Sequence, residues 1–331
     1  SIMITGDNPL TAATIAKEAG VSIGAVSRAM KGDTRISEKT RKKIQAVVKR
    51  LGYTPNSIGK GLRTGKSSLI GYLVSSLDDS FYNDILQGIG KSVCKRGYGI
   101  LTGITESNVK SEIEQLNLFL SKNVEGIIVS NYHEKTASFI RKIQKEGMPV
   151  VLCDIEPIKS IPRVAIDDVK AAELICQHLS QLGHKKYAYC FKKNRNSIDR
   201  FNACSNVLIT NGCNAPLLCT DKHQLDTLFA DAANHPTALI CYSDFVAVDV
   251  VNHLRGRGLS VPEDVSVVGF DDMYFASWPT YSLTTIYQPK TEMGFYAAET
   301  LFNMLDSTRA ATDMHLSPRL IVRNSTAVLK K

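Results

Sequence analysis

The pattern of apolar and polar residues changes twice along the chain. Over residues 10–53, apolar side chains recur every three or four positions, the spacing of one helix face. Gly20, Gly32 and Gly52 interrupt this spacing, so the pattern predicts short helices separated by tight turns. Two short helices joined by a turn that contains Gly have the form of a helix-turn-helix unit.

The rest of the chain shows two further patterns. Residues 54–68 are rich in Gly, Ser and Lys and lack a sustained apolar face, which is typical of a linker. Beyond them, amphipathic stretches separate short apolar runs at Leu69–Val74, Gly99–Leu101, Gly126–Val129, Val150–Cys153, Tyr187–Phe191, Leu239–Cys241 and Val265–Phe270. Continuous apolar strands that alternate with helices predict parallel sheets covered on both faces. We therefore expect an all-α head and an α/β body long enough for two such sheets.

Positive charge is concentrated in the predicted head. Residues 1–68 contain 13 Lys and Arg against 4 Asp and Glu, a net charge of +9, whereas residues 69–331 contain 27 against 28, a net charge of −1. Lys and Arg release condensed counterions when they neutralise a polyanion, so this distribution favours contact with nucleic-acid phosphates. A basic, solvated surface without such a partner is the alternative interpretation.

Cysteine usage and hydropathy limit the class of protein. The eight cysteines form no Cys-x-x-Cys pair and lie mostly within apolar runs, which indicates a reducing compartment and disfavours disulfides or a zinc site. The sequence shows neither an apolar run of about 20 residues, as a membrane span requires, nor a signal-peptide pattern. We therefore expect a cytoplasmic protein with no membrane partner and no cofactor.

Three short matches to catalytic motifs fail on their context. Residues Gly20 to Gly24 match the Gly-x-Ser-x-Gly nucleophile elbow, which needs a preceding strand, but here a helix precedes it. Gly65-Lys66-Ser67 and Gly90-Lys91-Ser92 lack the first Gly of a phosphate-binding loop. The seven His show no metal-ligand spacing. We expect no catalytic residue, no metal site and no enzymatic activity.

The head carries one specific motif set. It consists of Ala16, Ala19-Gly20-Val21-Ser22, Val26-Ser27-Arg28, Ile36-Ser37, Thr40-Arg41, Leu51-Gly52-Tyr53-x-Pro55-Asn56 and Gly65-Lys66-Ser67. This set closely resembles the DNA-binding head of the lactose/galactose repressor (LacI/GalR) family of bacterial regulators. Ala25 and Lys31 depart from it, since Thr and Asn are common there. The resemblance implies a helix-turn-helix domain over residues 1–56 and a hinge helix over residues 57–68.

The resemblance also implies how the head contacts DNA. The second helix enters the major groove, with Ile23, Gly24 and Arg28 on its exposed face. There Arg28 can pair with guanine through two hydrogen bonds, and Ile23 can contact a thymine methyl group. Phosphate contacts are expected from Thr11, Ser22, Ser27, Thr40 and Asn56. Helix capping is the alternative role of each Ser and Thr, and a solvated charge is that of Arg28.

In the hinge, Leu62 matches the residue that the family wedges into the minor groove. An inserted apolar side chain unstacks a base step and kinks the duplex. Gly59 and Gly61 depart from the family and weaken helix formation, so we expect this hinge to be disordered without DNA. An ordinary linker residue is the alternative role of Leu62.

The body resembles the sugar-binding core of the same family, which has the periplasmic binding protein fold. The matching runs are Leu182-Gly183-His184, Pro236-Thr237-Ala238, Ser243-Asp244, Val261 to Val265, Val268 to Asp272 and Leu283 to Ile286. The resemblance implies two doubly wound, parallel-sheet lobes within an effector-binding domain over residues 69–331. We expect an N-lobe of about residues 69–163 and 290–317, and a C-lobe of about residues 164–289 and 318–331.

Ligands of such sheets bind beyond the carboxyl ends of strands. Residues that follow predicted strands or match family pocket positions are Phe81, Tyr82, Asp154, Arg200, Ser243, Asp244, Asp271 and Trp278. Carboxylates, a guanidinium and aromatic rings together suit a sugar or sugar derivative. The alternatives are helix capping for Asp244, a turn after the strand for Asp271 and lobe packing for Trp278.

Two departures from the family affect this site. Ala203 stands where Gly is usual after the pocket arginine. The basic run Lys192 to Arg195 leaves an acidic or phosphorylated ligand open, with a solvated loop as the alternative.

These features together predict a sequence-specific transcription regulator, more specifically a repressor, whose operator affinity is controlled by a small sugar-like effector. One head contacts only a half-site, so we expect a homodimer on a palindromic double-stranded operator, associated with the nucleoid when bound. Two alternatives stay open. One is a small-molecule-binding or enzymatic α/β protein with an incidental basic head, and the other is a regulator that senses a partner protein.

Overall fold

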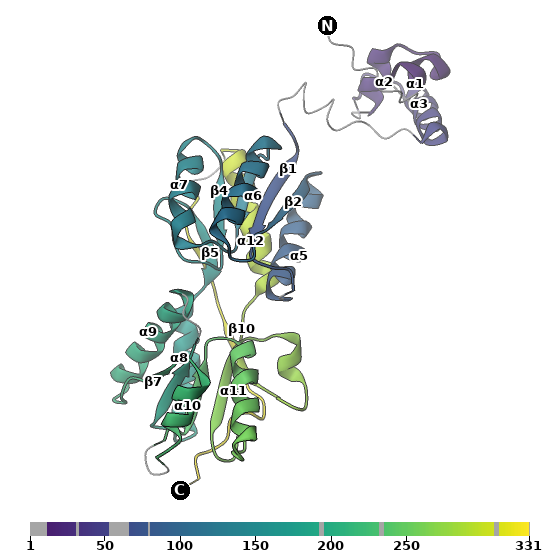
Figure 1. The fold of residues 1–331 in the computed structure, drawn as a ribbon. Helices are drawn as coiled ribbons and strands as arrows, with labels where there is room; N and C mark the ends of the chain where they lie inside the picture. The colour runs from purple at the N-terminus through teal and green to yellow at the C-terminus, as the bar shows by residue number, and fades with distance from the viewer. Residues whose placement is uncertain are drawn as a thin grey trace. The chain divides into compact units, whose positions relative to one another are not determined.

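The computed structural model divides the chain into two compact units, Ser1–Lys66 and Ser67–Lys331, called here the head and the body (Figure 1). The structure describes residues 12–30, 33–52, 66–78, 80–191, 195–231, 235–307 and 311–330. The predicted limits of the head domain and of the hinge stay predictions, because residues 53–65 lie outside this set. None of the described helices is long and apolar enough to span a lipid bilayer.

The described head consists of α1 (Ala12–Ala19), α2 (Ile23–Met30) and α3 (Glu38–Leu51). Their inward faces form one small core of Ile15, Ala16, Ala19, Val26, Ala29, Ile44 and Val47. Ser37 caps α3 by accepting a hydrogen bond from the Thr40 N–H, and Gly52 ends this helix in the left-handed conformation. The predicted all-α head is confirmed.

The body contains two six-stranded sheets. The first sheet has the order β11 (Met314–Leu316), β5 (Arg163–Ile166), β4 (Val150–Cys153), β3 (Gly126–Val129), β1 (Leu69–Val74), β2 (Gly99–Ile104). The second has the order β12 (Arg319–Ile321), β10 (Thr284–Tyr287), β9 (Ser266–Asp271), β8 (Ala238–Cys241), β6 (Tyr187–Cys190), β7 (Leu217–Cys219). All neighbours pair in parallel except β10 and β12. The predicted pair of doubly wound lobes is confirmed, with one antiparallel edge strand added.

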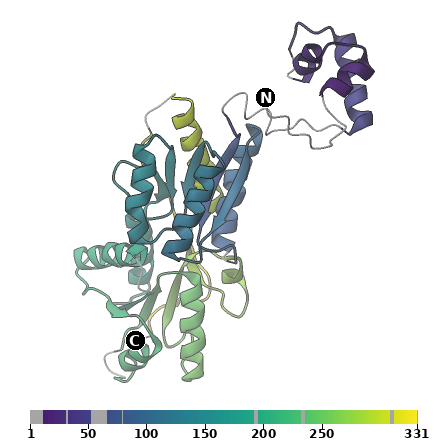
Figure 2. The same cartoon turned by 45° about the horizontal axis from the view of Figure 1, so that its top comes forward.

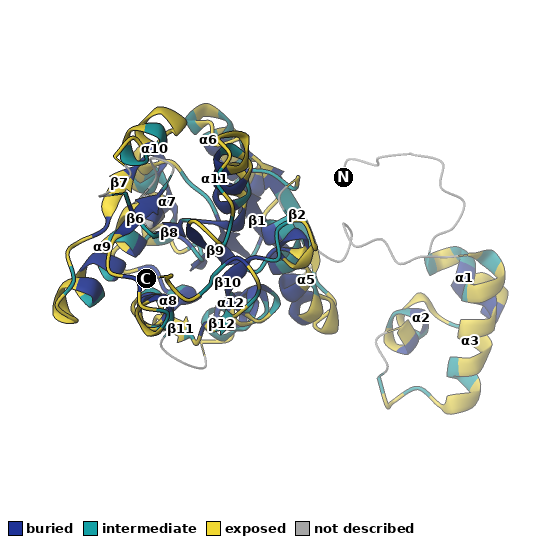
Figure 3. Cartoon of the chain, turned by 90° about the horizontal axis from the view of Figure 1, so that it is seen from below, coloured by how far each residue is buried: buried dark blue, intermediate teal, exposed yellow. Residues whose placement is uncertain are grey.

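Helices cover the sheets of both lobes (Figure 2). The N-lobe helices are α5 (Ser80–Lys95), α6 (Val109–Ser121), α7 (Ala137–Lys145) and α12 (Lys290–Leu305), and a 3-10 turn, η1 (Glu134–Thr136), precedes α7. The C-lobe helices are α8 (Asp168–Gln181), α9 (Arg195–Thr210), α10 (Lys222–Leu228) and α11 (Asp244–Gly256), with the 3-10 turn η2 (Tyr274–Ser277). Strands are largely buried, and helices expose their outer faces (Figure 3).

The N-lobe is assembled from two distant parts of the sequence. Helix α12, near the C-terminus, packs against α5 and against β3, β4 and β5. Gly88 and Gly294 allow this close approach, because a Cβ atom at either position would overlap the backbone of the other helix. The hydrophobic core of the N-lobe therefore depends on residues that lie about 200 positions apart in the sequence.

The chain passes between the two sheets three times within the described residues: after β5, between β10 and α12, and between β11 and β12. The first passage comes after Ile166, slightly later than the predicted lobe limit at residue 163, because β5 pairs with β4 in the first sheet. These passages bring the carboxyl ends of β4 and β9 to the same region between the lobes.

Candidate functional site

A tight turn fixes the two helices of the helix-turn-helix unit. Gly20 has a φ of 59°, a left-handed conformation that a Cβ atom makes unfavourable. The Val21 N–H donates to the Ala16 carbonyl at 2.9 Å. Ser22 then caps α2, because its hydroxyl oxygen accepts a hydrogen bond from the Ala25 N–H at 3.2 Å. The local sequence thus sets how α2 follows α1.

The outer face of α2 carries the three residues predicted to meet base edges. Ile23 is 55 % exposed, although isoleucine is among the most frequently buried residue types. Gly24 and Arg28 are exposed as well, while Val26 and Ala29 of the same helix are buried. A side chain at Gly24 would contact the Arg28 guanidinium, so these two residues share one face. An apolar group beside a guanidinium fits the hydrogen-bond acceptors and the methyl groups of the major groove.

Three of the residues predicted to contact phosphates are described: Ser22 precedes α2, Ser27 lies within α2, and Thr40 is in the first turn of α3. Ser22 is exposed, Ser27 is half-buried, and the Thr40 hydroxyl lies 2.8 Å from that of Ser37. Capping, the alternative role considered for Ser22, is present, but a hydroxyl that accepts from an N–H keeps its own hydrogen for a phosphate oxygen. The remaining predicted DNA contacts lie outside the described residues: Thr11, Asn56 and Leu62.

The acidic residues of the described head all have basic partners. The ion pairs are Arg35–Asp33, Lys42–Glu38 and Arg50–Glu18. Hydrogen bonds from Arg35 hold the pKa of Asp33 well below its usual range. Because basic residues outnumber acidic ones by 13 to 4 over residues 1–68, these pairs leave an excess of positive charge on the head.

In the body, one buried arginine joins the two lobes. Arg200 on α9 is 5 % exposed, and its Nε donates to the Asp168 carboxylate at 3.0 Å. Its terminal nitrogens lie 4.0 Å from an Asp154 oxygen and 3.9 Å from an Asp271 oxygen. The guanidinium carbon lies 3.8 Å from the centre of the Phe270 ring. Asp154 follows β4 of the N-lobe and Asp271 ends β9 of the C-lobe, so three predicted ligand residues come together here.

The backbone is strained where these aspartates lie. Asp154 has a φ of 51°, Asp271 of 108° and Asp272 of 48°, all in a region that non-glycine residues rarely adopt. Each such residue costs on the order of 1–3 kcal/mol and persists only where the surrounding structure imposes it. Arg323 binds the Asp272 carboxylate at 2.7 Å. This strain lies at the carboxyl ends of β4 and β9, where ligands of doubly wound sheets bind.

Two residues after β10 complete the surroundings of Asp271. The Gln288 amide donates to the Asp271 carboxylate at 2.5 Å, and the Lys290 ammonium donates to the Asp271 carbonyl at 2.5 Å. Lys290 also lies 3.9 Å from the Asp84 carboxylate on α5, so it too contacts both lobes. Gln288 and Lys290 were not among the residues predicted for the site. Both residues lie shortly after the run Leu283 to Ile286, which matches the family, and this position could have identified them.

Asp168 and Tyr242 were also missed. Asp168 begins α8 directly after β5, so the rule that selected Asp154, a polar residue beyond a strand, applies to it once β5 is recognised. The Tyr242 carbonyl accepts a hydrogen bond from Arg200 at 3.3 Å, and the Arg200 guanidinium lies 5.2 Å from the Tyr242 ring centre. Tyr242 directly follows β8, and Asp168 lies two residues after β5.

Burial changes the protonation of this cluster. It raises the pKa of Asp154 to about 6 and that of Asp271 well above its ordinary value, because lost hydration outweighs the attraction of Arg200. Burial by itself would lower the pKa of Arg200, but Asp168, Tyr242 and the other two aspartates raise it overall. The site therefore combines one permanent cation with carboxyl groups that take up a proton more readily than usual and can then donate as well as accept hydrogen bonds.

The other residues predicted for the ligand site make different contacts. Phe81 and Tyr82 on α5 have ring centres 5.5 Å apart, with the rings edge to face. Ser243 caps α11 by accepting from the Val246 N–H at 3.4 Å. Trp278 is 49 % exposed. Its ring meets those of Tyr274 and Phe275 edge-on. Ligand contact by these residues stays a prediction.

Asp244 is fully occupied by its own chain. One carboxylate oxygen accepts from the Met273 N–H at 2.7 Å, and the other accepts from the Thr285 hydroxyl at 2.6 Å. Burial raises the pKa of Asp244 to about 7. A Cβ atom at Gly269 would overlap the Asp244 carboxylate. Asp244 therefore ties η2 and β10 to the start of α11, and its predicted contact with a ligand is untested.

Comparisons with known proteins agree with this arrangement. Residues 13–56 match the model of bacterial regulatory proteins of the lacI family, and residues 176–326 match that of a periplasmic binding protein-like domain. The chain is 30 % identical to the HTH-type transcriptional regulator DegA of Bacillus subtilis (strain 168), over 95 % of this chain and 97 % of that protein. It is 28 % identical to catabolite control protein A of Priestia megaterium, over 94 % of this chain and 98 % of that protein.

Solved structures show the same fold. The lac repressor dimer bound to operator and the anti-inducer ONPF aligns with a TM-score of 0.86 at 24 % identity, over 96 % of this chain and 99 % of that one. The complex of the transcriptional regulator CelR with cellobiose aligns with a TM-score of 0.69 at 24 % identity, over 96 % of this chain and 99 % of that one. With a helix-turn-helix head, a two-lobed body and a 30 % identical regulator matched over nearly its whole length, the chain belongs to the LacI family of bacterial DNA-binding transcription regulators.

Proposed function

We propose that this chain is a homodimeric repressor that reads a palindromic operator through α2 and is controlled by a sugar or sugar derivative bound around Arg200. The observation that carries the proposal is the buried arginine, which lies within 4.0 Å of Asp154 from one lobe and Asp271 from the other. A guanidinium and carboxyl groups at one point can bind several hydroxyl groups at once.

The position of Arg200 suggests how a ligand changes the body. A polyhydroxylated molecule that enters between the lobes exchanges hydrogen bonds with Arg200, Asp154 and Asp271. These residues now contact one another, so the ligand alters the contacts that hold one lobe against the other. A ligand shifts a conformational equilibrium only by its difference in affinity for the two states, and contacts to both lobes provide such a difference.

Control of the operator follows from linkage between body and head. In a homodimer, each head contacts one half-site, and the spacing of the two heads selects the operator. The lac repressor, with the same fold, is solved as a dimer on its operator, which supports this arrangement. A lobe movement that changes this spacing, or the ordering of residues 57–68 with Leu62 as the wedge, alters operator affinity. Such coupling is reciprocal and typically of about 1–3 kcal/mol. The protein then acts in the cytoplasm, on the nucleoid.

The test is selection of bound duplexes from a random library by the full-length protein at moderate salt, repeated with a panel of sugars and sugar phosphates. We expect a palindromic sequence to be enriched, and its recovery to change with one compound of the panel. The sugar phosphates test whether the basic run at residues 192–195, most of which lies outside the described residues, favours a phosphorylated ligand. Absence of any enriched sequence would contradict the proposed repressor. An enriched palindrome that no compound affects would contradict the sugar-like effector and favour a partner protein as the signal.

A further inference from the structure

One carboxylate of the head lies between α2 and α3. The Asp33 N–H donates to the Arg28 carbonyl at 3.1 Å, which ties Asp33 to α2. The Asp33 carbonyl accepts from the Arg41 guanidinium at 2.8 Å, which ties it to α3. The side chain of Asp33 is therefore fixed beside the helix that is expected to enter the major groove.

This carboxylate holds Arg35, a residue of the same loop. Nε of Arg35 lies 3.1 Å from one Asp33 oxygen, and Nη2 lies 2.7 Å from the other. The Arg35 backbone N–H donates to the first oxygen at 3.0 Å. The Arg35 side chain is nevertheless 80 % exposed, and exposed ion pairs contribute little to stability. The pair therefore needs an explanation other than stability.

The contact with Asp33 leaves the outer end of the Arg35 guanidinium open. An arginine has five N–H donors, and Asp33 takes one on Nε and one on Nη2. No other residue in the described part of the chain accepts from the remaining three, which lie on Nη1 and Nη2. Two parallel N–H bonds at this end match the O6 and N7 acceptors of guanine.

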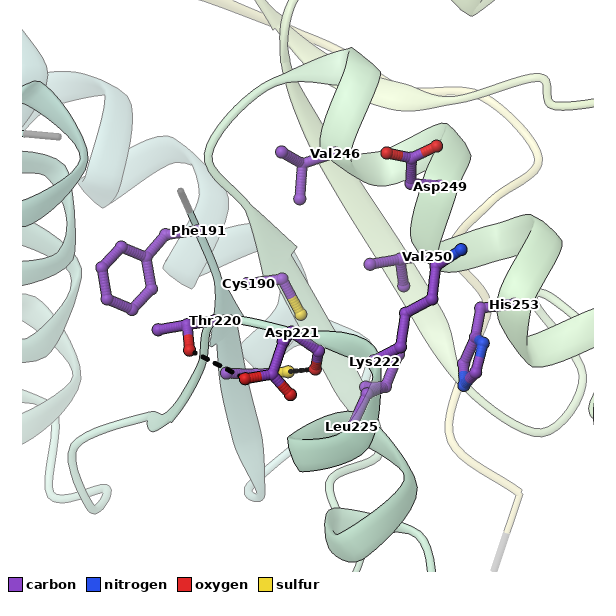
Figure 4. Close-up of a pocket in the computed structure, with 11 residues that line it drawn as sticks. Cys190, Phe191, Thr220, Asp221, Lys222, Leu225, Val246, Asp249, Val250 and His253 are labelled. Atoms are coloured by element: carbon purple, nitrogen blue, oxygen red, sulfur yellow. Dashed lines mark hydrogen bonds between the residues drawn. The ribbon is translucent and has the colours of Figure 1, made fainter. Parts of the chain in front are cut away.

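Asp221 of the C-lobe shows a carboxylate whose role is complete within the chain. It borders a cavity of about 270 Å³ near β6, β7, α10 and α11 (Figure 4). One Asp221 oxygen accepts from the Gln224 N–H at 2.8 Å, and the other accepts from the Thr220 hydroxyl at 3.4 Å. Asp221 thereby caps the start of α10, a role that needs no ligand. Asp33, in contrast, orients a cation whose outer donors face away from it.

Arg28 acts on the same carboxylate as Arg35. The hydrogen bonds from Arg35 hold the pKa of Asp33 well below its usual range, and the positive charge of Arg28 lowers it further. Both guanidinium groups therefore lie near Asp33, on the side of the head where α2 exposes Arg28. Asp33 also offsets the charge of Arg35, so the pair attracts a phosphate less than a lone arginine does. An uncharged base edge is the better partner.

We propose that Arg35 reads a second guanine in each operator half-site, and that Asp33 is the positioning residue that orients it. The inference rests on the proposed reading of the operator through α2. Because Asp33 already holds the guanidinium in one orientation, less side-chain freedom is lost when Arg35 meets a base. Arg28 and Arg35 then specify two different base pairs of each half-site.

The experiment selects bound duplexes from a random library with the full-length protein, and then measures the affinities of the protein and of Arg35→Lys for single-base variants of the selected operator. Lysine keeps the charge but lacks the fork, so discrimination should fall about 5- to 150-fold at one base pair of each half-site. This base pair should differ from the one that Arg28→Ala relaxes. An equal loss on all sequences would assign Arg35 to a phosphate and would overturn the inference.

Asp33→Asn tests the positioning role. An amide has one acceptor oxygen where the carboxylate has two, so discrimination at the same base pair should fall about two- to tenfold, the range of one hydrogen bond. Binding to DNA that lacks this guanine should not weaken, because the charge of Arg35 is no longer offset. A purely structural role would weaken binding to every sequence, and that result would overturn the role of Asp33.

Arg50→Lys is the matched control. Arg50 on α3 also forms an exposed ion pair, with Glu18 of α1, and its replacement should leave all base preferences unchanged. Absence of any selected palindrome for the unmodified protein would contradict the proposed function and this inference together. A selected palindrome whose base preferences are the same in Arg35→Lys would overturn this inference alone.

Discussion

Arg28 in the head and Arg200 in the body present the same guanidinium group in opposite settings. Arg28 lies exposed on α2, beside a glycine that leaves the helix face open. Arg200 is 5 % exposed and lies among three carboxylates and the Phe270 ring. An exposed guanidinium meets a partner without rearrangement of the chain, whereas a buried one must first exchange internal contacts.

This difference separates recognition from control. Helix α2 presents its exposed residues without a change in chain conformation, so the contacts proposed for this helix should contribute nearly independently to operator affinity. The body holds its polar groups in a coupled cluster that spans both lobes, so a ligand bound there, as proposed, would change the contacts between the lobes. Substitutions should therefore affect affinity alone in the head, but both stability and response in the body.

The largest effect is expected from Arg200→Gln. Removing the guanidinium from a buried ionic cluster leaves its carboxylates without their main charged partner, which typically costs about 3–5 kcal/mol in the free energy of unfolding. The loss should shrink at about pH 5, because the raised pKa of Asp154 allows that carboxyl to take up a proton. Urea unfolding at neutral pH and at about pH 5 measures the loss of stability and its reduction in acid. Arg141→Gln, at an exposed position on α7, is the control, and an equally small loss at both positions would contradict the buried cluster.

Asp244→Asn tests whether a buried carboxyl group of the body makes stability depend on pH. Burial raises the pKa of Asp244 to about 7, above the roughly 3.9 of an exposed aspartate. Between these values the folded chain holds a proton that the unfolded chain has lost, so the contribution of Asp244 to stability falls as pH rises through this window. From pH 4.5 to 7.5 the unmodified chain should lose on the order of 3 kcal/mol more stability than Asp244→Asn.

Asp33 of the head provides the control of opposite sign. Its pKa is lowered by the hydrogen bonds from Arg35, so the stabilisation that it provides is present above the pKa of an unfolded aspartate and is lost as pH falls further. Asp33→Asn should therefore change the stability profile only on the acid side. Parallel pH profiles for the unmodified chain and Asp244→Asn would show that Asp244 titrates as an exposed acid.

Arg28→Ala should have an intermediate effect, on operator affinity alone. Loss of a bidentate contact to guanine typically costs about 1–3 kcal/mol and relaxes the preference at one base pair of each half-site. Because Arg28 is exposed, the free energy of unfolding of the head should stay the same. Binding to the selected operator and to its single-base variants measures the change. Lys39→Ala, an exposed cation on α3, is the control, and any loss there should be equal for all sequences.

Ile23→Ala should have the smallest effect. The contact proposed for it with a thymine methyl group would bury little area, so the loss should be about 1 kcal/mol in operator affinity. Ile23 is 55 % exposed, and stability should not change. Ile44→Ala is the contrasting variant, because that side chain is fully buried and its truncation should cost about 2–5 kcal/mol of head stability. A destabilised Ile23→Ala would mean that Ile23 packs against the head and is not available to DNA.

The long buried elements of the fold could be predicted from the sequence. The apolar runs at Leu69–Val74 and Val150–Cys153 coincide with β1 and β4. The three-residue edge strands β7, β11 and β12 were missed, because their residues are partly exposed and too few to show a pattern. They form only where the central strands offer unpaired backbone groups.

The candidate site could be predicted only in part, because a local rule finds strand ends but not contacts between distant residues. The rule that ligands lie beyond strand ends selected Asp154 and Asp271, which the structure brings to Arg200. The same rule could not separate them from Asp244, whose partner Thr285 lies 41 positions away and adjoins it only in the folded sheet. Contacts between residues so distant in the sequence follow from topology and leave no local pattern.

The most direct test of the division between recognition and control measures operator affinity with and without the effector found by library selection, for the unmodified protein, Arg28→Ala and Asp271→Ala. We expect Arg28→Ala to weaken operator binding about 5- to 150-fold, corresponding to 1–3 kcal/mol, and to keep its response to the effector. We expect Asp271→Ala to bind the operator as well as the unmodified protein does and to lose its response. A normal effector response in Asp271→Ala, or a lost response in Arg28→Ala, would disprove this division of roles.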